Sequence, residues 1–300
     1  MATQVHPNDA VNGQKTRTIV LTGGTGGIGF QSALGIAKTE GVRVLITGRN
    51  RETGEAAVKR LIDETGNKNV ELVVGDVSSI AGIKALASAL VDRAKVIDVL
   101  VNNAGYLGST LKHNDDGIEM HFAVNVLAPW QLTMALLPAL KAADHCRVLN
   151  ITGGDKPAAI DKENLQAERG FKGLMTYTHS KSAMEAMSVA LAEKLKPEGV
   201  TVNVLFPGRA STSMTRSLSA KSLPGCMKVM YPCLQQLFKE DGGKSAAKAA
   251  RSTIWGATSP EIEGVTGRYF DTLTKEQKMH KTAYDPEVHA RILAVIEKAG

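Results

Sequence analysis

Aromatic residues make up only 4% of this 300-residue sequence, and the apolar 43% is therefore mostly aliphatic. An aliphatic core suits buried parallel strands better than an aromatic-rich β protein. The sequence also lacks any run of about 18 apolar residues, so we expect no transmembrane segment. No basic block alternates with aromatic residues, and the net charge is only +6. Nucleic acid is therefore not an expected partner.

Cysteine is scarce as well. The three cysteines, Cys146, Cys226 and Cys233, have neither the spacing of a metal site nor that of a disulfide framework. We therefore expect no metal, and a reducing compartment, which favours a cytoplasmic location. Residues 1–15 are polar and lack the apolar core of a signal peptide. We interpret them as a flexible tail before a single domain that spans residues 16–300.

A short β-branched run at residues 17–21 leads into a glycine-rich stretch, and a helical pattern follows it. The spacing is Gly-x-x-x-Gly-x-Gly at Gly23, Gly27 and Gly29, which differs from the common dinucleotide fingerprint and from a Walker loop. Glycines let the backbone approach a ligand closely, and a helix N-terminus offers free N–H groups to phosphate. The stretch predicts a nucleotide-phosphate loop; the alternative is a merely flexible turn.

The second predicted strand, residues 42–47, ends in Gly48-Arg49-Asn50-Arg51. In dinucleotide folds an acidic residue at this place binds the ribose hydroxyls, whereas an arginine accommodates a 2′-phosphate. The acid is missing here, which favours NADP(H) over NAD(H). Arg49, directly after the glycine, is the better candidate. The alternative is that both arginines are solvated charges at the start of the next helix.

The next two predicted strands, residues 70–75 and 96–101, end in polar or small residues. Asp76 could contact the adenine edge or help cap the following helix, for which Ser78 is also a candidate. The fourth strand runs into Asn102-Asn103-Ala104-Gly105, which suits the close passage of a cofactor. The two strand ends therefore predict further cofactor contacts.

A long amphipathic helix is predicted over residues 116–140. It carries Asn125 on an apolar face, where the amide needs a partner. That partner is either a structural hydrogen bond or part of a site. Pro129 lies inside the same helix and should bend it or free a carbonyl there.

The stretch from Thr152 to Lys181 ends in the pattern Tyr177-x-x-x-Lys181. Positions i and i+4 of a helix lie on one face, so the phenol and the ammonium can point at the same place. A nearby cation should lower the pKa of the phenol from its usual value of about 10. Such a tyrosine can exchange a proton with a carbonyl or an alcohol. The alternative is two residues on a solvated helix face.

The remaining patterns continue the alternation of strands and helices. Strands are predicted at residues 146–151, 200–206 and 267–270, a surface helix at 245–258 and a terminal helix at 286–299. This alternation predicts an α/β fold with a Rossmann-type, doubly wound parallel sheet of about seven strands in a single domain.

From about residue 16 to 212 the sequence resembles the short-chain dehydrogenase/reductase family. The motifs that carry the resemblance occur in family order: Thr22-Gly23-x-x-x-Gly27-x-Gly29, Asp76, Asn102-Asn103-Ala104-Gly105, Asn125, Tyr177-x-x-x-Lys181, and Pro207-Gly208 with Thr212. The Gly48-Arg49 ending and the long gap before the tyrosine resemble the retinol-dehydrogenase-like branch.

The resemblance implies an NADP(H)-dependent oxidoreductase that interconverts a lipophilic or aromatic carbonyl and its alcohol. Tyr177 would be the acid/base, Lys181 would hold the nicotinamide ribose, and Asn125 would hold a water in a proton relay. The residues expected at the cofactor are Gly23, Thr25, Gly27, Ile28, Gly29, Arg49, Asp76, Val77, Asn103, Ala104, Gly105, Tyr177, Lys181, Pro207, Gly208 and Thr212.

The chain departs from the family at the end of the fifth strand. The family usually has a serine that binds the substrate oxygen, and its position aligns with Gly153. The adjacent Thr152 could supply the hydroxyl instead. Neighbouring strand residues point to opposite faces, so this would require a shift in the turn. We therefore count Thr152 among the candidate catalytic residues. The alternative function is an NADP(H)-binding sensor or interaction protein with little turnover.

Residues 213–240 contain an apolar stretch interrupted by prolines. It predicts a lid over a lipophilic substrate, because adaptable methionines suit an irregular pocket. The alternatives are packing on the core, a homodimer contact or a membrane contact.

Overall fold

The computed structural model describes residues 16–153, 158–216, 223, 231–232, 236 and 239–300. Residues 1–15, the predicted tail, and most of the predicted lid at 213–240 lie outside the described residues. An eight-stranded sheet forms the centre of the molecule, in the order β3-β2-β1-β4-β5-β6-β7-β8. The strands are β1 (Arg17–Leu21), β2 (Val42–Gly48), β3 (Val70–Val74), β4 (Val99–Asn102), β5 (Arg147–Ile151), β6 (Thr201–Leu205), β7 (Tyr269–Phe270) and β8 (Glu276–Gln277).

The predicted doubly wound parallel sheet is confirmed, with one strand more than the expected seven. Strands β1 to β7 pair in parallel, and only β8 runs antiparallel, with Tyr269 opposite Gln277. Both residues of β8 are exposed, so the strand has no apolar pattern to reveal it. It forms because Asp271 accepts the N–H groups of Leu273 and Lys275 and closes the turn between the two strands.

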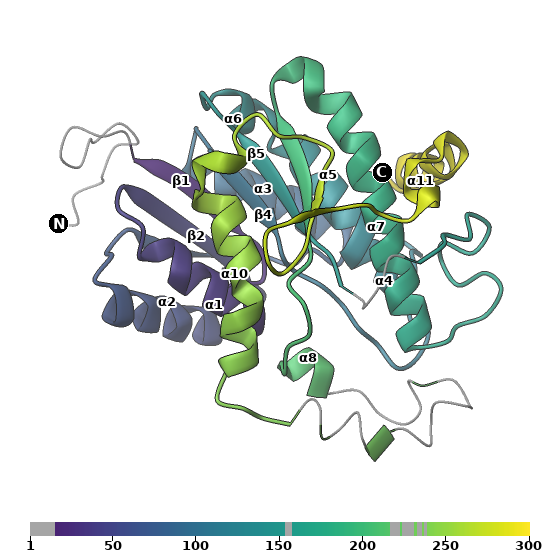
Figure 1. Ribbon diagram of the computed structural model, residues 1–300, viewed down its shortest axis with the longest axis horizontal. Coiled ribbons are helices and arrows are strands. Elements are labelled where there is room, and N and C mark those ends of the chain that lie inside the picture. Colours follow the sequence, from purple (N-terminus) through teal and green to yellow (C-terminus); the bar gives the residue numbers. More distant parts are fainter. Residues whose placement is uncertain (1–15, 154–157, 217–222, 224–230, 233–235, 237–238) are drawn as a thin grey trace.

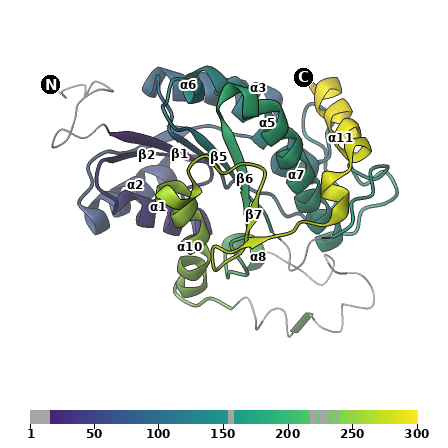
Figure 2. The ribbon, with the colours of Figure 1, turned by 45° about the horizontal axis from the view of Figure 1, so that its top comes forward.

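Helices cover both faces of this sheet (Figures 1 and 2). Strand residues alternate between two apolar clusters, so that Ile19 and Leu21 of β1 face one helix layer and Val20 faces the other. The first layer consists of α1 (Gly27–Ala37), α2 (Arg51–Thr65) and α10 (Lys244–Thr258), and the second of α3 (Ile80–Arg93), α5 (Ala128–Ala135), α7 (Leu174–Leu195) and α11 (Pro286–Ala299). The shorter helices are α4 (Met120–Phe122), η1 (Ala123–Leu127), α6 (Leu137–Lys141), η2 (Lys196–Glu198), α8 (Ser213–Arg216), η5 (Pro260–Ile262) and η6 (Lys281–Tyr284).

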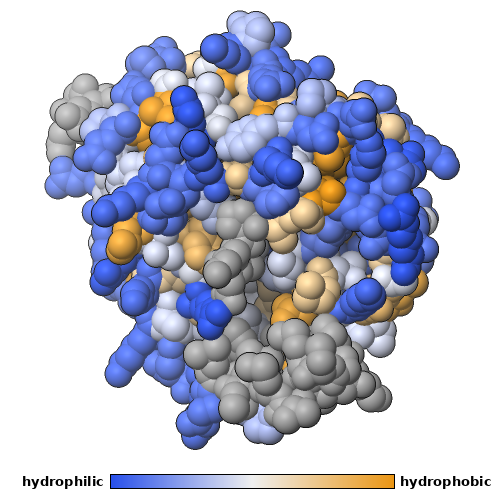
Figure 3. All heavy atoms as spheres, turned by 45° about the vertical axis from the view of Figure 1, so that its right-hand side comes forward, coloured by the Kyte–Doolittle hydropathy of each residue, from blue (hydrophilic) through white to orange (hydrophobic). Residues whose placement is uncertain are grey.

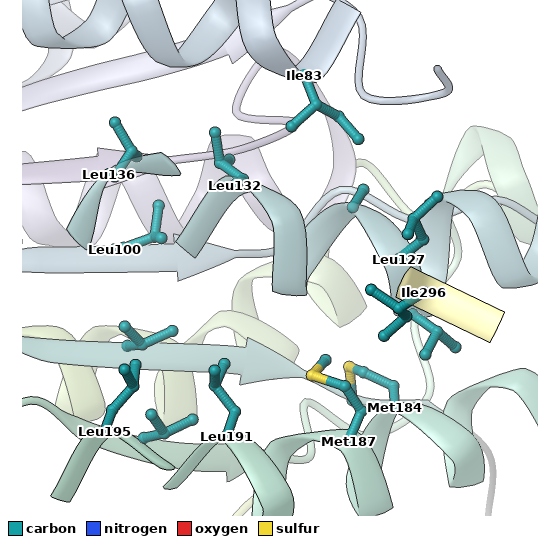
Figure 4. Packing of buried hydrophobic residues seen from close by; sticks show 14 of the residues in the cluster. Ile83, Leu100, Leu127, Leu132, Leu136, Met184, Met187, Leu191, Leu195 and Ile296 are labelled. Atoms are coloured by element: carbon teal, nitrogen blue, oxygen red, sulfur yellow. The ribbon is translucent and has the colours of Figure 1, made fainter. Parts of the chain in front are cut away.

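The second cluster is almost entirely aliphatic, as the low aromatic content suggested. Figure 4 shows leucines of α5 and α7 packed with Met184, Met187 and Ile296 around the strands. The predicted terminal helix is confirmed as α11, whose buried stripe consists of Val288, Ile292 and Ile296. Hydrophilic side chains cover most of the described surface on the face that Figure 3 draws.

The prediction of one helix over residues 116–140 is wrong in two respects: the helix starts later, and it is not continuous. It begins at Met120, because Asp116 turns away to accept the N–H of Ile80 at the start of α3. A π-helix follows at Ala123–Leu127, and Pro129 then occupies the first turn of α5. A proline is tolerated in the first turn of a helix because the N–H group that it lacks would have no acceptor within the helix there. The π-helix carries Asn125, and such segments are frequent at functional sites.

One smaller expectation is also corrected. The N-cap of α3 is Ser79, not Ser78, because the Ser79 hydroxyl accepts the N–H of Gly82.

The predicted surface helix is present as α10, with one face exposed and the other buried against α1. A Cβ atom at Gly35 of α1 would lie 2.1 Å from the Cδ1 atom of Ile254. This close approach of two helices depends on small residues, which an amphipathic pattern alone does not reveal.

Candidate active site

A cavity of about 500 Å³ opens at the carboxyl ends of the parallel strands. Its lining comes from the segments that follow β1 to β6, together with the start of α7. The strand order reverses between β1 and β4, and ligands of doubly wound sheets bind in the crevice at this switch point. Every residue predicted at the cofactor, from Gly23 to Thr212, lines this one cavity.

The glycine turn has the backbone geometry that the spacing suggested. Gly23 and Gly27 have φ angles of +68° and +54°, which favour glycine. A Cβ atom at Gly29 would lie 2.1 Å from the carbonyl oxygen of Gly23. Helix α1 begins after Gly26, which has no side chain to cap it, so its first N–H groups are available to an anion at the cavity.

Asn103 holds the glycine turn in place. Its Nδ2 atom donates to the carbonyl oxygens of Thr22 and Gly23, at 2.9 and 3.2 Å. The Thr22 hydroxyl in turn accepts the N–H groups of Asn103 and Ala104. The segment after β4 is therefore tied to the turn after β1, and two motifs 80 residues apart become one wall of the cavity.

Tyr177 and Lys181 lie one helical turn apart near the start of α7, and both line the cavity. Lys181 is only 4% exposed, and its Nζ atom donates to the carbonyl oxygen of Ile151 at 2.9 Å. The expectation that the cation lowers the tyrosine pKa is wrong for this structure. Burial raises the pKa of Tyr177 to about 12 and lowers the pKa of Lys181 to about 8. Desolvation is the largest cause of both shifts.

Asn125 does not line the cavity and has a different set of contacts. Its Nδ2 atom donates to the Tyr106 carbonyl oxygen at 3.0 Å and to the Ser180 hydroxyl at 2.9 Å. Its Oδ1 atom accepts the N–H of Tyr106 at 2.9 Å. The amide therefore fixes the loop after β4 to helix α7, beside Lys181. The water relay through Asn125 stays a prediction.

In the turn after β5, Thr152 and Gly153, the residues at the position of the family's usual serine, face in different directions. The Thr152 hydroxyl donates to Oε1 of Glu185 at 2.7 Å, and Thr152 is buried. Gly153 faces the other way: a Cβ atom there would lie 2.5 Å from the Tyr177 hydroxyl. The serine position thus faces the tyrosine but has no side chain, and the one adjacent hydroxyl is committed to a carboxylate.

Four further residues, Tyr106, Glu119, His121 and Phe171, form a cluster that reaches Tyr177 through His121 and that no sequence pattern indicated. The His121 ring lies 5.1, 5.6 and 6.4 Å from the rings of Tyr106, Phe171 and Tyr177. Its Nε2 atom accepts the N–H of Gly108, so Nδ1 carries the proton and donates to Glu119 at 2.6 Å. These residues come from the loop after β4, from the start of α4 and from the segment before α7, and no sequence spacing connects them.

The rest of the lining near these elements is largely apolar. It includes Tyr106, Leu107, Met120, Val124, Leu174 and Met214.

Among the residues that the structure describes, no group of three or more metal-ligating side chains comes together. No helix within the same residues has the length and apolarity to cross a bilayer.

A doubly wound sheet with a glycine turn and a tyrosine–lysine pair at one cavity defines a nucleotide-binding enzyme of the Rossmann type. The family described as short chain dehydrogenase matches residues 17–223. The chain belongs to this family and is an oxidoreductase. The family and the fold that the sequence predicted are thereby confirmed.

Several relatives match nearly the whole chain. Human retinol dehydrogenase 13 is 32% identical over 280 residues, which are 93% of this chain and 82% of that protein. Human polyprenol dehydrogenase is 30% identical over 278 residues, 89% of this chain and 80% of that protein. These relatives confirm the predicted retinol-dehydrogenase-like branch.

Two solved structures show the same fold. A protein from Mycobacterium paratuberculosis has a TM-score of 0.71 at 23% identity, with 94% of this chain and 92% of that chain covered. The RhlG–NADP complex of Pseudomonas aeruginosa has a TM-score of 0.62 at 27% identity, with 89% and 97% covered.

Proposed function

We propose that the protein is an NADP(H)-dependent oxidoreductase that interconverts a lipophilic or aromatic carbonyl and its alcohol. The observation that carries the proposal is that Tyr177 and Lys181 line the same cavity as the glycine turn and Arg49. The apolar lining supports a lipophilic substrate. So do the names of two relatives, which refer to retinol and polyprenol. The Pseudomonas aeruginosa relative is a complex with NADP, which supports the cofactor.

The residues present fit a dinucleotide with a 2′-phosphate. The uncapped start of α1 and the glycine turn suit the pyrophosphate, since a side chain at Gly29 would fill the space of the turn itself. Arg49 is exposed and lines the cavity. Arg51 instead lies in α2, where its guanidinium pairs with Glu55 at 3.5 Å. Of the two arginines, Arg49 is therefore the one that suits the phosphate.

The nicotinamide, when bound, supplies or accepts the hydride. In reduction, Tyr177 donates its proton to the substrate oxygen; in oxidation, the same phenolate takes the proton from the alcohol. Lys181 is held by the Ile151 carbonyl oxygen at the side of the cavity, where its ammonium can bind the ribose and offsets, without overcoming, the burial that disfavours the phenolate. Asn125 keeps the neighbouring loop in register with α7.

The cofactor preference provides one test. Arg49→Asp should weaken NADPH binding by about 10- to 150-fold, because a hydrogen bond to a charged group is worth about 1.5–3 kcal/mol. NADH, which has no 2′-phosphate, should bind equally well or better. Binding can be measured by the fluorescence of either reduced cofactor. Arg51→Asp is the matched control and should keep the wild-type ratio. An unchanged ratio of NADPH to NADH affinity in Arg49→Asp would contradict the assignment.

The alternative function, a sensor or interaction protein with little turnover, rests on Gly153 and on the commitment of Thr152 to Glu185. It is not favoured, because the named relatives are dehydrogenases. We propose that α8 borders the substrate side of the cavity, since Ser213, Met214 and Thr215 line it, whereas most of the predicted lid lies outside the described residues.

A further inference from the structure

Glu185 is a buried carboxylate behind the tyrosine–lysine pair. It lies on α7 one turn after Lys181, and only 4% of its surface is exposed. Its Oε1 atom accepts the Thr152 hydroxyl at 2.7 Å, whereas Oε2 is buried with no hydrogen-bond partner among the described residues. Burying a carboxylate is unfavourable unless another group compensates its charge. Nothing in the proton transfer at Tyr177 requires an acid at this place, so its role needs a separate account.

The polar groups that act on Glu185 come from three elements, and two of them, Lys181 and Tyr269, are titratable. Lys181 lies on the same helix, and the negative charge of Glu185 favours its protonated form. Thr152 approaches from the end of β5. Tyr269 lies on β7, and burial, together with the charges of Glu185 and Asp271, raises the pKa of that phenol. Tyr269 therefore stays neutral, and Lys181, one helical turn earlier on α7, is the buried cation whose pKa the carboxylate raises.

We propose that Glu185 is a positioning residue for the reaction, which acts through two neighbours. It is the counter-charge that keeps the buried Lys181 ammonium ionised, and it anchors the turn after β5 through the Thr152 hydroxyl. The anchor matters because the next residue, Gly153, lies against the Tyr177 hydroxyl. The inference deepens the proposed function and rests on it, since Lys181 must be charged to act on Tyr177 and on the ribose.

The pKa values of Lys181 and Glu185 are consistent with this role. Burial lowers the pKa of Lys181 to about 8, and the carboxylate opposes that shift. Burial raises the pKa of Glu185 to about 7. Reduction requires protonated Tyr177 and protonated Lys181. Because the pKa of Tyr177 is about 12, the alkaline limb of the rate profile should report Lys181. Without the negative charge, Lys181 should lose its proton at a lower pH.

The test compares Glu185→Gln with the wild type across pH, in the direction of reduction. Glutamine keeps an oxygen that can accept the Thr152 hydroxyl but removes the charge. We expect the alkaline limb of kcat/KM to move down by about one pH unit, a typical effect of an opposite charge nearby. Glu193→Gln, at an exposed position of the same helix, should leave the limb in place. A limb that coincides with the wild type would overturn the counter-charge.

Two further variants separate the two proposed roles of Glu185, the counter-charge to Lys181 and the anchor of the turn after β5. Thr152→Val removes the hydroxyl and keeps the charge, so we expect kcat to fall while the alkaline limb stays at the wild-type pH. Glu185→Asp keeps the charge but shortens the side chain, and it should behave in the same way. It also keeps the proposal testable if Glu185→Gln does not fold, which circular dichroism would reveal. Unchanged kcat in Thr152→Val would overturn the anchor.

NADPH affinity separates this inference from the proposed function. If the wild type turns over no tested carbonyl, the pH dependence of NADPH binding still reports the charge of Lys181. As the pH rises, NADPH affinity should begin to fall at a lower pH in Glu185→Gln than in the wild type. That result would support the counter-charge even if no carbonyl is reduced. Identical binding profiles would overturn it, whether or not turnover is found.

Discussion

Tyr177→Phe is expected to lower turnover by about 10²- to 10⁴-fold, the usual contribution of a positioned acid or base. The substitution removes only the hydroxyl and keeps the ring, which packs against His121 at 6.4 Å. Lys181 keeps its hydrogen bond to Ile151. NADPH affinity and stability should therefore change little. A loss confined to the rate would identify the hydroxyl as the proton donor.

The measurement is NADPH consumption over a panel of lipophilic aldehydes and ketones, with NADPH binding followed in parallel. Tyr284→Phe, at a tyrosine that is 46% exposed, is the matched control and should behave as the wild type. A Tyr177→Phe enzyme with the wild-type rate would mean that another group moves the proton. NADPH binding with no Tyr177-dependent turnover on any compound would instead support the sensor alternative.

Gly29→Ala is expected to reduce NADPH affinity by about 5- to 150-fold, and to lower the melting temperature. The added Cβ atom would lie 2.1 Å from the Gly23 carbonyl oxygen and 2.5 Å from the Asn103 Nδ2 atom. Neither neighbour can yield freely, because one is backbone and the other holds the turn through two hydrogen bonds. Overpacking of this kind typically costs about 1–3 kcal/mol. The phosphate loop must shift, and its N–H groups then no longer point at one place.

Gly26→Ala is the matched comparison for Gly29→Ala in the same turn. Gly26 has an extended backbone, with φ at −166°, and a Cβ atom there would meet nothing within 4 Å. Its effect on stability should stay within about 1 kcal/mol, the usual scale for a change at an N-cap, and its loss of affinity should be far smaller. Isothermal titration with NADPH and thermal melts measure both effects. Equal losses in the two variants would contradict a steric cause specific to position 29.

The fold and most of the cavity lining could be predicted because their signals are local. Short aliphatic runs rich in β-branched residues favour buried strands, and each strand end brings its next residues to the same edge of a parallel sheet. Gly23, Arg49, Asp76 and Asn103 therefore reached one cavity as expected. The spacing of Tyr177 and Lys181 likewise needed only the geometry of a helix.

Contacts between distant elements could not be predicted in this way. The start of the helix near Met120 depends on Asp116 binding α3 instead. The tyrosine pKa is raised and not lowered, because the depth of burial is a property of the whole packed site. The position of His121 beside Tyr106 and Phe171 similarly arises from three segments that only packing joins.

By itself the sequence determined the class of fold, the glycine turn and the tyrosine–lysine pair, because each follows from the backbone preferences of a few consecutive residues. Only the tertiary structure decided what surrounds the pair. It directed Thr152 to Glu185 and left Gly153 against the tyrosine hydroxyl. The reason is physical: desolvation and hydrogen-bond pairing depend on every element that packs around a group, and residues 33 positions apart in the chain carry no local sign that they will meet.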